Sequence, residues 1–204
     1  MSALARFFNS RGIKISGYDK TPSPLTDELI HEGIKIHFEE NISLIPKEVD
    51  LVVYTPAVPA EHKELIFYRA NNYEVVKRSD LLEQVTKDSF TIAVAGTHGK
   101  TTTTSLIAHL LKSSGYDCTA FLGGISVNYN SNFLSGKNNV IVVEADEYDR
   151  SFLKLHPDIA IITSADADHL DIYGSGDEVV KSFIEFAHQI KKEGRDRKST
   201  RLNS

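Results

Sequence analysis

The residues best suited to chemistry in this chain form a short run with two glycines, a lysine and several hydroxyls, at 96–104. The run follows an apolar segment, 92–95, and precedes apolar residues at helical spacing, 106–111. Glycine lets the backbone curl so that its N–H groups point at phosphate oxygens, and the N-terminal end of a following helix favours the same anion. The order strand, loop, helix therefore predicts a phosphate-binding loop.

The side chains of this loop suit a nucleotide that carries magnesium. Lys100 would neutralise the β- and γ-phosphates, and the Thr101 hydroxyl would join the coordination shell of Mg²⁺. The general pattern asks for a glycine where this chain has Val94, so the match is to a variant loop. A glycine turn with a surface lysine is the alternative, and the flanking strand and helix disfavour it. The residues expected to bind the nucleotide are Gly96, Thr97, His98, Gly99, Lys100, Thr101 and Thr102.

Carboxylates crowd the end of a second apolar segment, 140–143. Glu144, Asp146, Glu147 and Asp149 follow it, and like charges this close are costly unless a cation is present. Ligands of open α/β sheets bind at this edge. Glu144, the first of them after the strand, is the predicted magnesium ligand. For the other three, a solvated acidic turn is an open alternative.

A histidine among carboxylates follows a third apolar segment, 159–162. The run 166–171 contains His169, and a neutral imidazole oriented by a carboxylate can ligate a divalent ion. His169 is therefore the candidate ligand of a second metal. The alternative is a protonated histidine in a surface salt bridge.

The elements that would position these residues alternate between strand-like runs and amphipathic stretches, as in βαβ units. A short crossover helix is expected within 23–33, with proline near its start and glycine past its end. The later strand-like runs consist almost entirely of apolar residues, as expected when helices cover both faces of a parallel sheet. The predicted fold is α/β, with two doubly wound, mostly parallel sheets. Expected strands are 13–16, 34–38, 51–54, 74–76, 90–95, 120–122, 140–143 and 159–162.

We place a domain boundary near 87–88, where a polar stretch ends one series and a buried strand opens the next. The expected domains are a Rossmann-like domain at 1–88 and a central phosphate-loop domain at 89–193. Residues 2–8 have the character of a helix whose preceding strand is absent. Residues 194–204 lose apolar periodicity, which favours a non-native tail over a solvated one.

Composition narrows the possible partners. With 23 basic and 28 acidic residues the net charge is -5. A negative net charge does not attract nucleic acid or an anionic membrane surface. The apolar runs are too short to span a bilayer. Cys118 stands alone in an apolar stretch and is expected to be a core residue. We therefore expect a cytoplasmic protein.

Taken together, these motifs resemble those of the Mur ligases. The resemblance covers 1 to about 190 and rests on 93–104, Gly123-Gly124, 143–147, 151–153 and 166–174, with 1–5, 15–19 and 53–58 similar to the family's UDP-sugar-binding half. It implies three domains, of which the first two are represented. The family's glycine-rich diphosphate loop would precede Met1, and where the family commonly has asparagine before 166–171 this chain has Ser164.

The resemblance also implies an activity: an ATP-dependent ligase that joins L-alanine to UDP-N-acetylmuramate. ATP would phosphorylate the lactyl carboxylate, and the amine of L-alanine would attack the acyl phosphate. In this reading Lys100, Glu144 and His169 are catalytic, while Thr101 and Glu144 hold one Mg²⁺ and His169 the other. His98 would help to orient the sugar substrate. These 204 residues alone are expected to be inactive as a ligase.

Two other functions fit part of the pattern. A sister ligase attaches a recycled murein tripeptide to the same UDP-sugar, but the run 166–171 is closer to the L-alanine enzymes. A phosphate-loop kinase or regulatory NTP-binding module would explain the loop and leave the N-terminal βαβ series without a purpose.

Overall fold

The computed structural model describes residues 1–166, 173–191 and 195–198, with backbone alone at 149 and at 195–198. The chain divides into two compact units, Met1–Leu81 and Leu82–Ser204. The division falls inside helix α4 (Arg78–Lys87), whereas the boundary expected from the sequence lies just after this helix.

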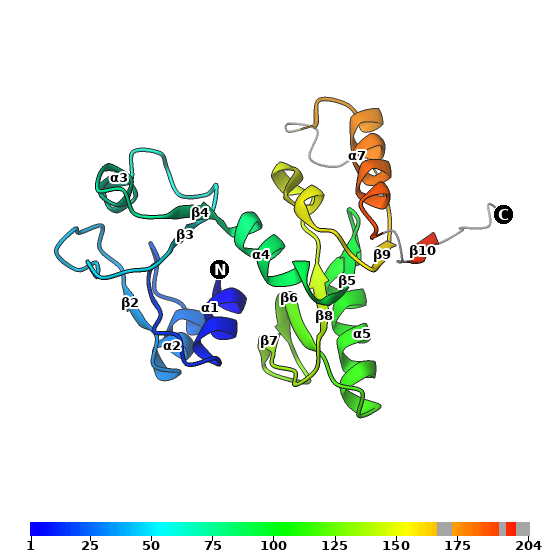
Figure 1. Cartoon of the computed structure of the whole chain (residues 1–204), viewed down its shortest axis with the longest axis horizontal. Coiled ribbons are helices and arrows are strands. Elements are labelled where there is room, and N and C mark those ends of the chain that lie inside the picture. The colour runs from blue at the N-terminus through cyan, green and yellow to red at the C-terminus, as the bar shows by residue number, and fades with distance from the viewer. Residues whose placement is uncertain (167–172, 192–194, 199–204) are drawn as a thin grey trace. The chain divides into compact units, whose positions relative to one another are not determined.

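The first unit contains four short strands in two separate parallel pairs (Figure 1). We expected one sheet here; the described residues form two ladders instead, β1 with β2 and β3 with β4. Strand β1 also starts later than expected, at Ser16, after a turn in which Gly12 has φ +78°. The elements are α1 (Ser2–Asn9), β1 (Ser16–Tyr18), α2 (Pro24–His31), β2 (Lys35–His37), β3 (Val52–Tyr54), α3 (Lys63–Ala70) and β4 (Val75–Lys77).

Helix α2 begins where the sequence predicts. Ser23 is its N-cap, accepts a hydrogen bond from the Thr26 N–H, and Pro24 occupies the first turn. Arg6 of α1 is buried and donates to Glu28 at 2.8 Å and to Glu32 at 2.9 Å. This charge network joins the two helices, because a buried guanidinium needs carboxylate partners.

The second unit is built on one six-stranded sheet of order β10-β9-β5-β8-β6-β7. All pairings are parallel except that of β6 with β7. Neither β7 nor β10 was expected from the sequence, and β10 lies within 194–204, where a non-native tail was expected. Helix α5 packs on β5, β6 and β8, and α7 packs on η1 (Figure 1). The elements are β5 (Phe90–Ala95), α5 (Lys100–Ser113), β6 (Thr119–Ser126), β7 (Ser131–Leu134), β8 (Val140–Glu144), η1 (Tyr148–Lys154), β9 (Ile159–Ile162), α7 (Gly176–His188) and β10 (Arg195–Lys198).

The core of this sheet is mainly apolar, as the nearly unbroken runs predict. Ala93, Val94, Ala95, Val142 and Val143 have no measurable exposure. Cys118 is also fully buried, and burial raises the pKa of its thiol to about 11, in keeping with the expected core role.

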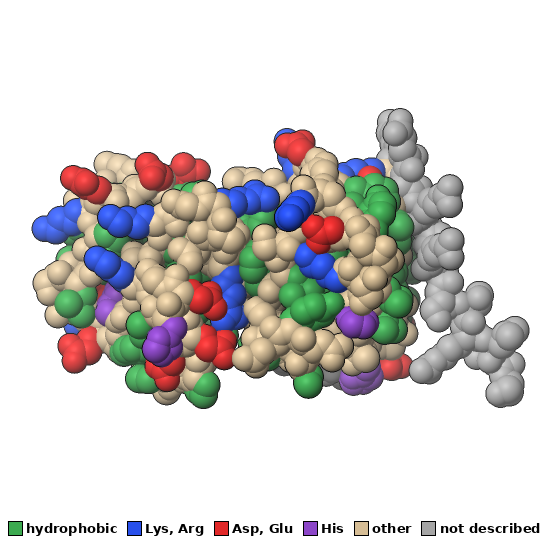
Figure 2. Space-filling model, turned by 90° about the horizontal axis from the view of Figure 1, so that it is seen from below, with side chains coloured by type: hydrophobic (Ala, Val, Ile, Leu, Met, Phe, Trp, Pro, Cys, Tyr) green, Lys and Arg blue, Asp and Glu red, His purple; other side chains and the backbone are tan. Residues whose placement is uncertain are grey.

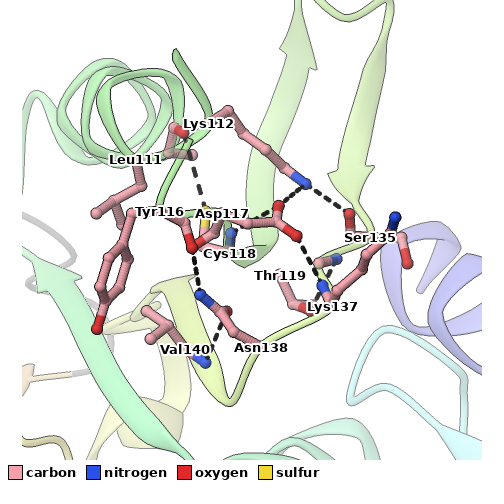
Figure 3. Close-up of polar contacts among 12 residues, drawn as sticks. Leu111, Lys112, Tyr116, Asp117, Cys118, Thr119, Ser135, Lys137, Asn138 and Val140 are labelled. Carbon is pink, nitrogen blue, oxygen red and sulfur yellow. Dashed lines mark hydrogen bonds and ion pairs between the residues drawn. The ribbon is translucent and has the colours of Figure 1, made fainter. Parts of the chain in front are cut away.

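A polar cluster fastens the C-terminal end of α5 to the start of β6 (Figure 3). Asp117 accepts hydrogen bonds from the Lys112 ammonium, from the Lys137 N–H at 2.8 Å and from the Cys118 N–H at 2.9 Å. The Lys112 hydrogen bond is the largest of the causes that lower the pKa of Asp117 to about 2. Asn138 donates to the carbonyls of Tyr116 and Asp117 and completes the turn.

Charged side chains of both signs are mixed over the face drawn in Figure 2. This agrees with the modest net charge of -5. Among the described residues, no helix has the length and apolar character needed to cross a membrane.

Candidate functional site

The phosphate-loop residues lie at the carboxyl edge of the central sheet. β5 ends at Ala95, the loop follows, and α5 starts at Lys100. From β5 the chain continues through α5 to β6, which lies on one side of β5 in the sheet. β9 pairs with β5 on its other side. Ligands of open α/β sheets bind at such a reversal of strand order.

Two glycines have backbone conformations that other residues adopt rarely. Gly96 has φ +134° and Gly99, the N-cap of α5, has φ +78°. A Cβ on Gly96 would lie 2.2 Å from the Thr163 hydroxyl and 2.9 Å from the Ser164 nitrogen. Position 96 therefore excludes a side chain on both conformational and steric grounds.

The end of β9 holds this loop in place. The Thr163 hydroxyl lies within hydrogen-bond distance of the carbonyl oxygens of Ala95 (3.1 Å) and His98 (2.5 Å). Ser164 Oγ accepts from the His98 N–H at 2.9 Å and lies 2.8 Å from Thr97 Oγ1. Thr163 was not predicted as a site residue, and Ser164 was given no role; two hydroxyls directly after a buried strand were the available signal.

The start of α5 is well suited to an anion. Its first N–H groups have no partner within the helix. No acidic residue lies in its first turn, and Gly99 supplies no capping side chain. The positive end of the helix dipole is therefore uncompensated by the helix's own side chains.

Lys100 is held by two oxygens. Its Nζ donates to the Gly96 carbonyl at 2.7 Å and to Glu147 Oε1 at 2.7 Å. The Glu147 side chain is 2% exposed and that of Lys100 16%. Of the carboxylates for which a solvated turn was left open, Asp146 is exposed but Glu147 is buried, so the solvated reading is wrong for Glu147.

Glu144 and Thr101 each lie beside one of two consecutive glycines of β6. Glu144 Oε2 accepts from the Gly123 N–H at 2.9 Å, and a Cβ on Gly123 would lie 2.3 Å from that carboxylate. A Cβ on Gly124 would lie 3.4 Å from Thr101 Cγ2. The absence of a side chain at Gly123 leaves room for the Glu144 carboxylate, and Gly124 lies beside the Thr101 methyl group.

This donor set fits a magnesium ion that is shared with phosphates. Mg²⁺ at nucleotide sites takes one or two protein oxygens and completes its shell with phosphate and water. Thr101 and Glu144 offer such oxygens. Within residues 1–166 and 173–191, no group of three or more histidine, cysteine or acidic side chains forms an all-protein metal site.

Two histidines were also predicted to belong to the site. His169, the candidate ligand of a second metal, lies outside the described residues. His98 is exposed beside the loop, and its role in orienting the sugar stays a prediction.

Known protein families match both units. The description "Mur ligase family, catalytic domain" matches residues 1–90 and "Mur ligase middle domain" matches 94–197. The UDP-N-acetylmuramate–L-alanine ligase of Flavobacterium johnsoniae is 60% identical over 94% of this chain and 43% of its own length. That of Porphyromonas gingivalis is 56% identical over 95% and 44%.

Solved structures of such proteins are similar as well. The crystal structure of the UDP-N-acetylmuramate–alanine ligase of Thermotoga maritima has a TM-score of 0.86 at 32% identity, covering 93% of this chain and 45% of that one. A ligase from Neisseria meningitides that takes a tripeptide has a TM-score of 0.90 at 23% identity, covering 99% and 68%, and shows the fold alone.

A mostly parallel sheet with a glycine-containing loop at its carboxyl edge, followed by a helix N-terminus, is an arrangement typical of nucleotide-binding α/β proteins. With both of its units matched, this chain belongs to the Mur ligase family. It spans less than half the length of the curated relatives it matches.

Proposed function

We propose that this chain is part of an ATP-dependent ligase that joins L-alanine to UDP-N-acetylmuramate in the synthesis of peptidoglycan precursors. The observation that carries the proposal is the phosphate loop, with Lys100 over it and Thr101 and Glu144 beside it. The choice of L-alanine is supported by curated relatives of that name at 49–60% identity. Its place would be the cytoplasm, where ATP and a UDP-linked precursor are at hand.

The proposed reaction starts with a carboxylate, which is a poor acylating group. Transfer of the γ-phosphoryl group of ATP to the lactyl carboxylate gives an acyl phosphate and ADP. The amine of L-alanine then attacks the acyl carbon, the amide bond forms, and phosphate leaves. Phosphoryl transfer of this kind depends chiefly on positioning and on charge stabilisation.

The residues of this chain would supply those two effects. The N–H groups at the start of α5 would bind phosphate oxygens, and Lys100 would stabilise the transferring group. Thr101 and Glu144 would hold Mg²⁺, whose chemistry is to neutralise the phosphate charge. His169 would hold a second ion, and His98 would face the sugar substrate.

The experiment that tests this proposal measures phosphate release by the complete protein that contains this chain, given ATP, Mg²⁺ and UDP-N-acetylmuramate. One sample receives L-alanine and the other L-Ala-γ-D-Glu-diaminopimelate. We expect release with L-alanine alone. Release with the tripeptide alone would instead assign the recycling activity, and release with neither would reopen an NTP-binding role of another kind.

The 204 residues by themselves are expected to release no phosphate with all substrates present. The ligase of Flavobacterium johnsoniae matches this chain over only 43% of its own length. Turnover by this chain alone would contradict that expectation.

A further inference from the structure

We infer that Glu147 positions Lys100 for phosphate, and that the neutralised pair makes nucleotide binding at this loop depend on a divalent cation. The inference rests on the proposed function in one respect, that the loop binds ATP. It concerns a residue for which the sequence alone left a solvated turn open.

Lys100 already makes two hydrogen bonds in this structure. An ammonium group has three N–H donors. Two of them are directed at the Gly96 carbonyl and at Glu147 Oε1, both at 2.7 Å. One donor is left for a ligand, and its direction is fixed because the other two are held.

Glu147 is more deeply buried than Lys100. Its side chain is 2% exposed, against 16% for Lys100. If Lys100 left this carboxylate to follow a phosphate, Glu147 would lose its ion pair with Lys100 in a site from which water is largely excluded, and that is unfavourable. Lys100 therefore remains paired when nucleotide binds and offers only its third donor.

Glu147 is itself anchored through its backbone. Its carbonyl accepts from the Tyr173 hydroxyl at 2.6 Å and from the Arg150 N–H at 3.0 Å. Tyr173 is buried, and the guanidinium of Arg150 lies 5.2 Å from the centre of its ring. The backbone of Glu147, whose carboxylate holds Lys100, is thus tied to η1 through Arg150 and to Tyr173, which precedes α7.

The loop carries charges of both signs. The positive charge of Lys100 is offset by Glu147, and Glu144 adds a carboxylate at the end of β8. A nucleotide brings several negative charges to this place. The helix dipole alone attracts them weakly, since it amounts to roughly half a unit charge. Tight nucleotide binding then requires a divalent cation. This dependence on the cation is stronger here than at a loop whose lysine has no carboxylate partner.

The experiment measures binding of ADP to the 204-residue chain by calorimetry, at about 0.15 M salt. Each titration is made once with Mg²⁺ and once with EDTA. The variants are Glu147→Gln, which keeps an acceptor and removes the charge, and Glu147→Asp, which keeps the charge and withdraws the acceptor. Asp146→Asn is the matched control, because it removes an exposed charge from the neighbouring position. Thermal unfolding of each variant checks that it is folded.

With EDTA, Glu147→Gln is expected to bind ADP about fivefold more tightly than the unchanged chain, because one repelling charge is gone. With Mg²⁺ it should stay within about twofold. Glu147→Asp should bind about fivefold more weakly under both conditions, since Lys100 loses its fixed direction. Asp146→Asn should stay within about twofold throughout.

Three results would count against the inference. If Glu147→Gln binds ADP with EDTA no more tightly than Asp146→Asn does, the charge of Glu147 does not weaken nucleotide binding. Glu147→Asp binding as tightly as the unchanged chain would remove the positioning role; if Glu147→Gln does not fold, Glu147→Asp decides alone. If the unchanged chain fails to bind ADP with Mg²⁺, the proposed function fails, and the inference fails with it.

Discussion

At the scale of single residues, the site depends on places where a side chain is missing. Gly96 and Gly123 each lie against another group so closely that a Cβ would fall 2.2 Å or 2.3 Å from it. At Gly96 that group is the end of β9, and at Gly123 it is the Glu144 carboxylate. The glycines therefore do more than allow a tight turn: they let functional groups approach the backbone.

Gly96→Ala tests this argument. The new methyl group would meet Thr163 Oγ1 and the Ser164 backbone, at a φ of +134°. We expect a loss of about 2–4 kcal/mol in the free energy of unfolding, measured by chemical denaturation. Gly115→Ala is the control, because φ there is +78° and nothing lies within 4 Å. It should lose only about 1 kcal/mol. Equal losses in the two variants would mean that crowding at Gly96 is unimportant.

The sequence predicted the loop residues but only part of what holds them. Strand, glycines, lysine and helix are consecutive in the chain, so their order predicts a local structure. The contacts of Thr163 with His98 and of Glu147 with Lys100 join residues 65 and 47 positions apart. Their partners become neighbours only through the order of strands in the sheet. Local patterns carry no information on such pairs.

At the scale of elements, apolar runs predicted the strands of the central sheet well and those of the first unit less well. β5, β8 and β9 are almost unbroken apolar segments, and each was expected within one residue of its observed bounds. β7 was missed because its sequence, Ser-Asn-Phe-Leu, has neither alternation nor a continuous apolar run. Its strand character comes from antiparallel pairing with β6.

The junction of α5 and β6 leads to a pH prediction. The Lys112 hydrogen bond, with those from the Lys137 and Cys118 amides, lowers the pKa of Asp117 from its ordinary 3.8 to about 2. A lowered folded-state pKa adds stability that is present above about pH 4 and lost as the pH falls through about 2. Asp117→Asn should therefore be less stable than the unchanged chain at pH 5, with the difference closing toward pH 2.

Asparagine suits this test because it tolerates the left-handed backbone of position 117, where φ is +69°. The measurement is the free energy of unfolding of both proteins by urea between pH 5 and pH 2. A difference that stays constant over this range would show that Asp117 acts through its shape and not through its charge.

At the scale of the whole molecule, the two units differ in how their strands are supported. Strands β1 to β4 are three residues each, they pair two by two in the part of the chain that the structure describes, and none of their residues is fully buried. Five of the six residues of β5 are buried, and this strand has a partner on each side. An isolated pair of strands is marginal in water, whereas a covered sheet of several strands is stable.

Hydrogen exchange should therefore separate the two units. Backbone amides of β1 to β4 are expected to exchange at least about a hundredfold faster than those of β5 and β8, because local opening of a two-stranded ladder breaks few buried contacts. Mass spectrometry of peptides from the exchanged chain gives the measurement, with α2 as an internal reference for the first unit. If peptides from both units exchange at one common rate, the chain opens as a single cooperative body, and the short ladders are stabilised by contacts other than their own pairing.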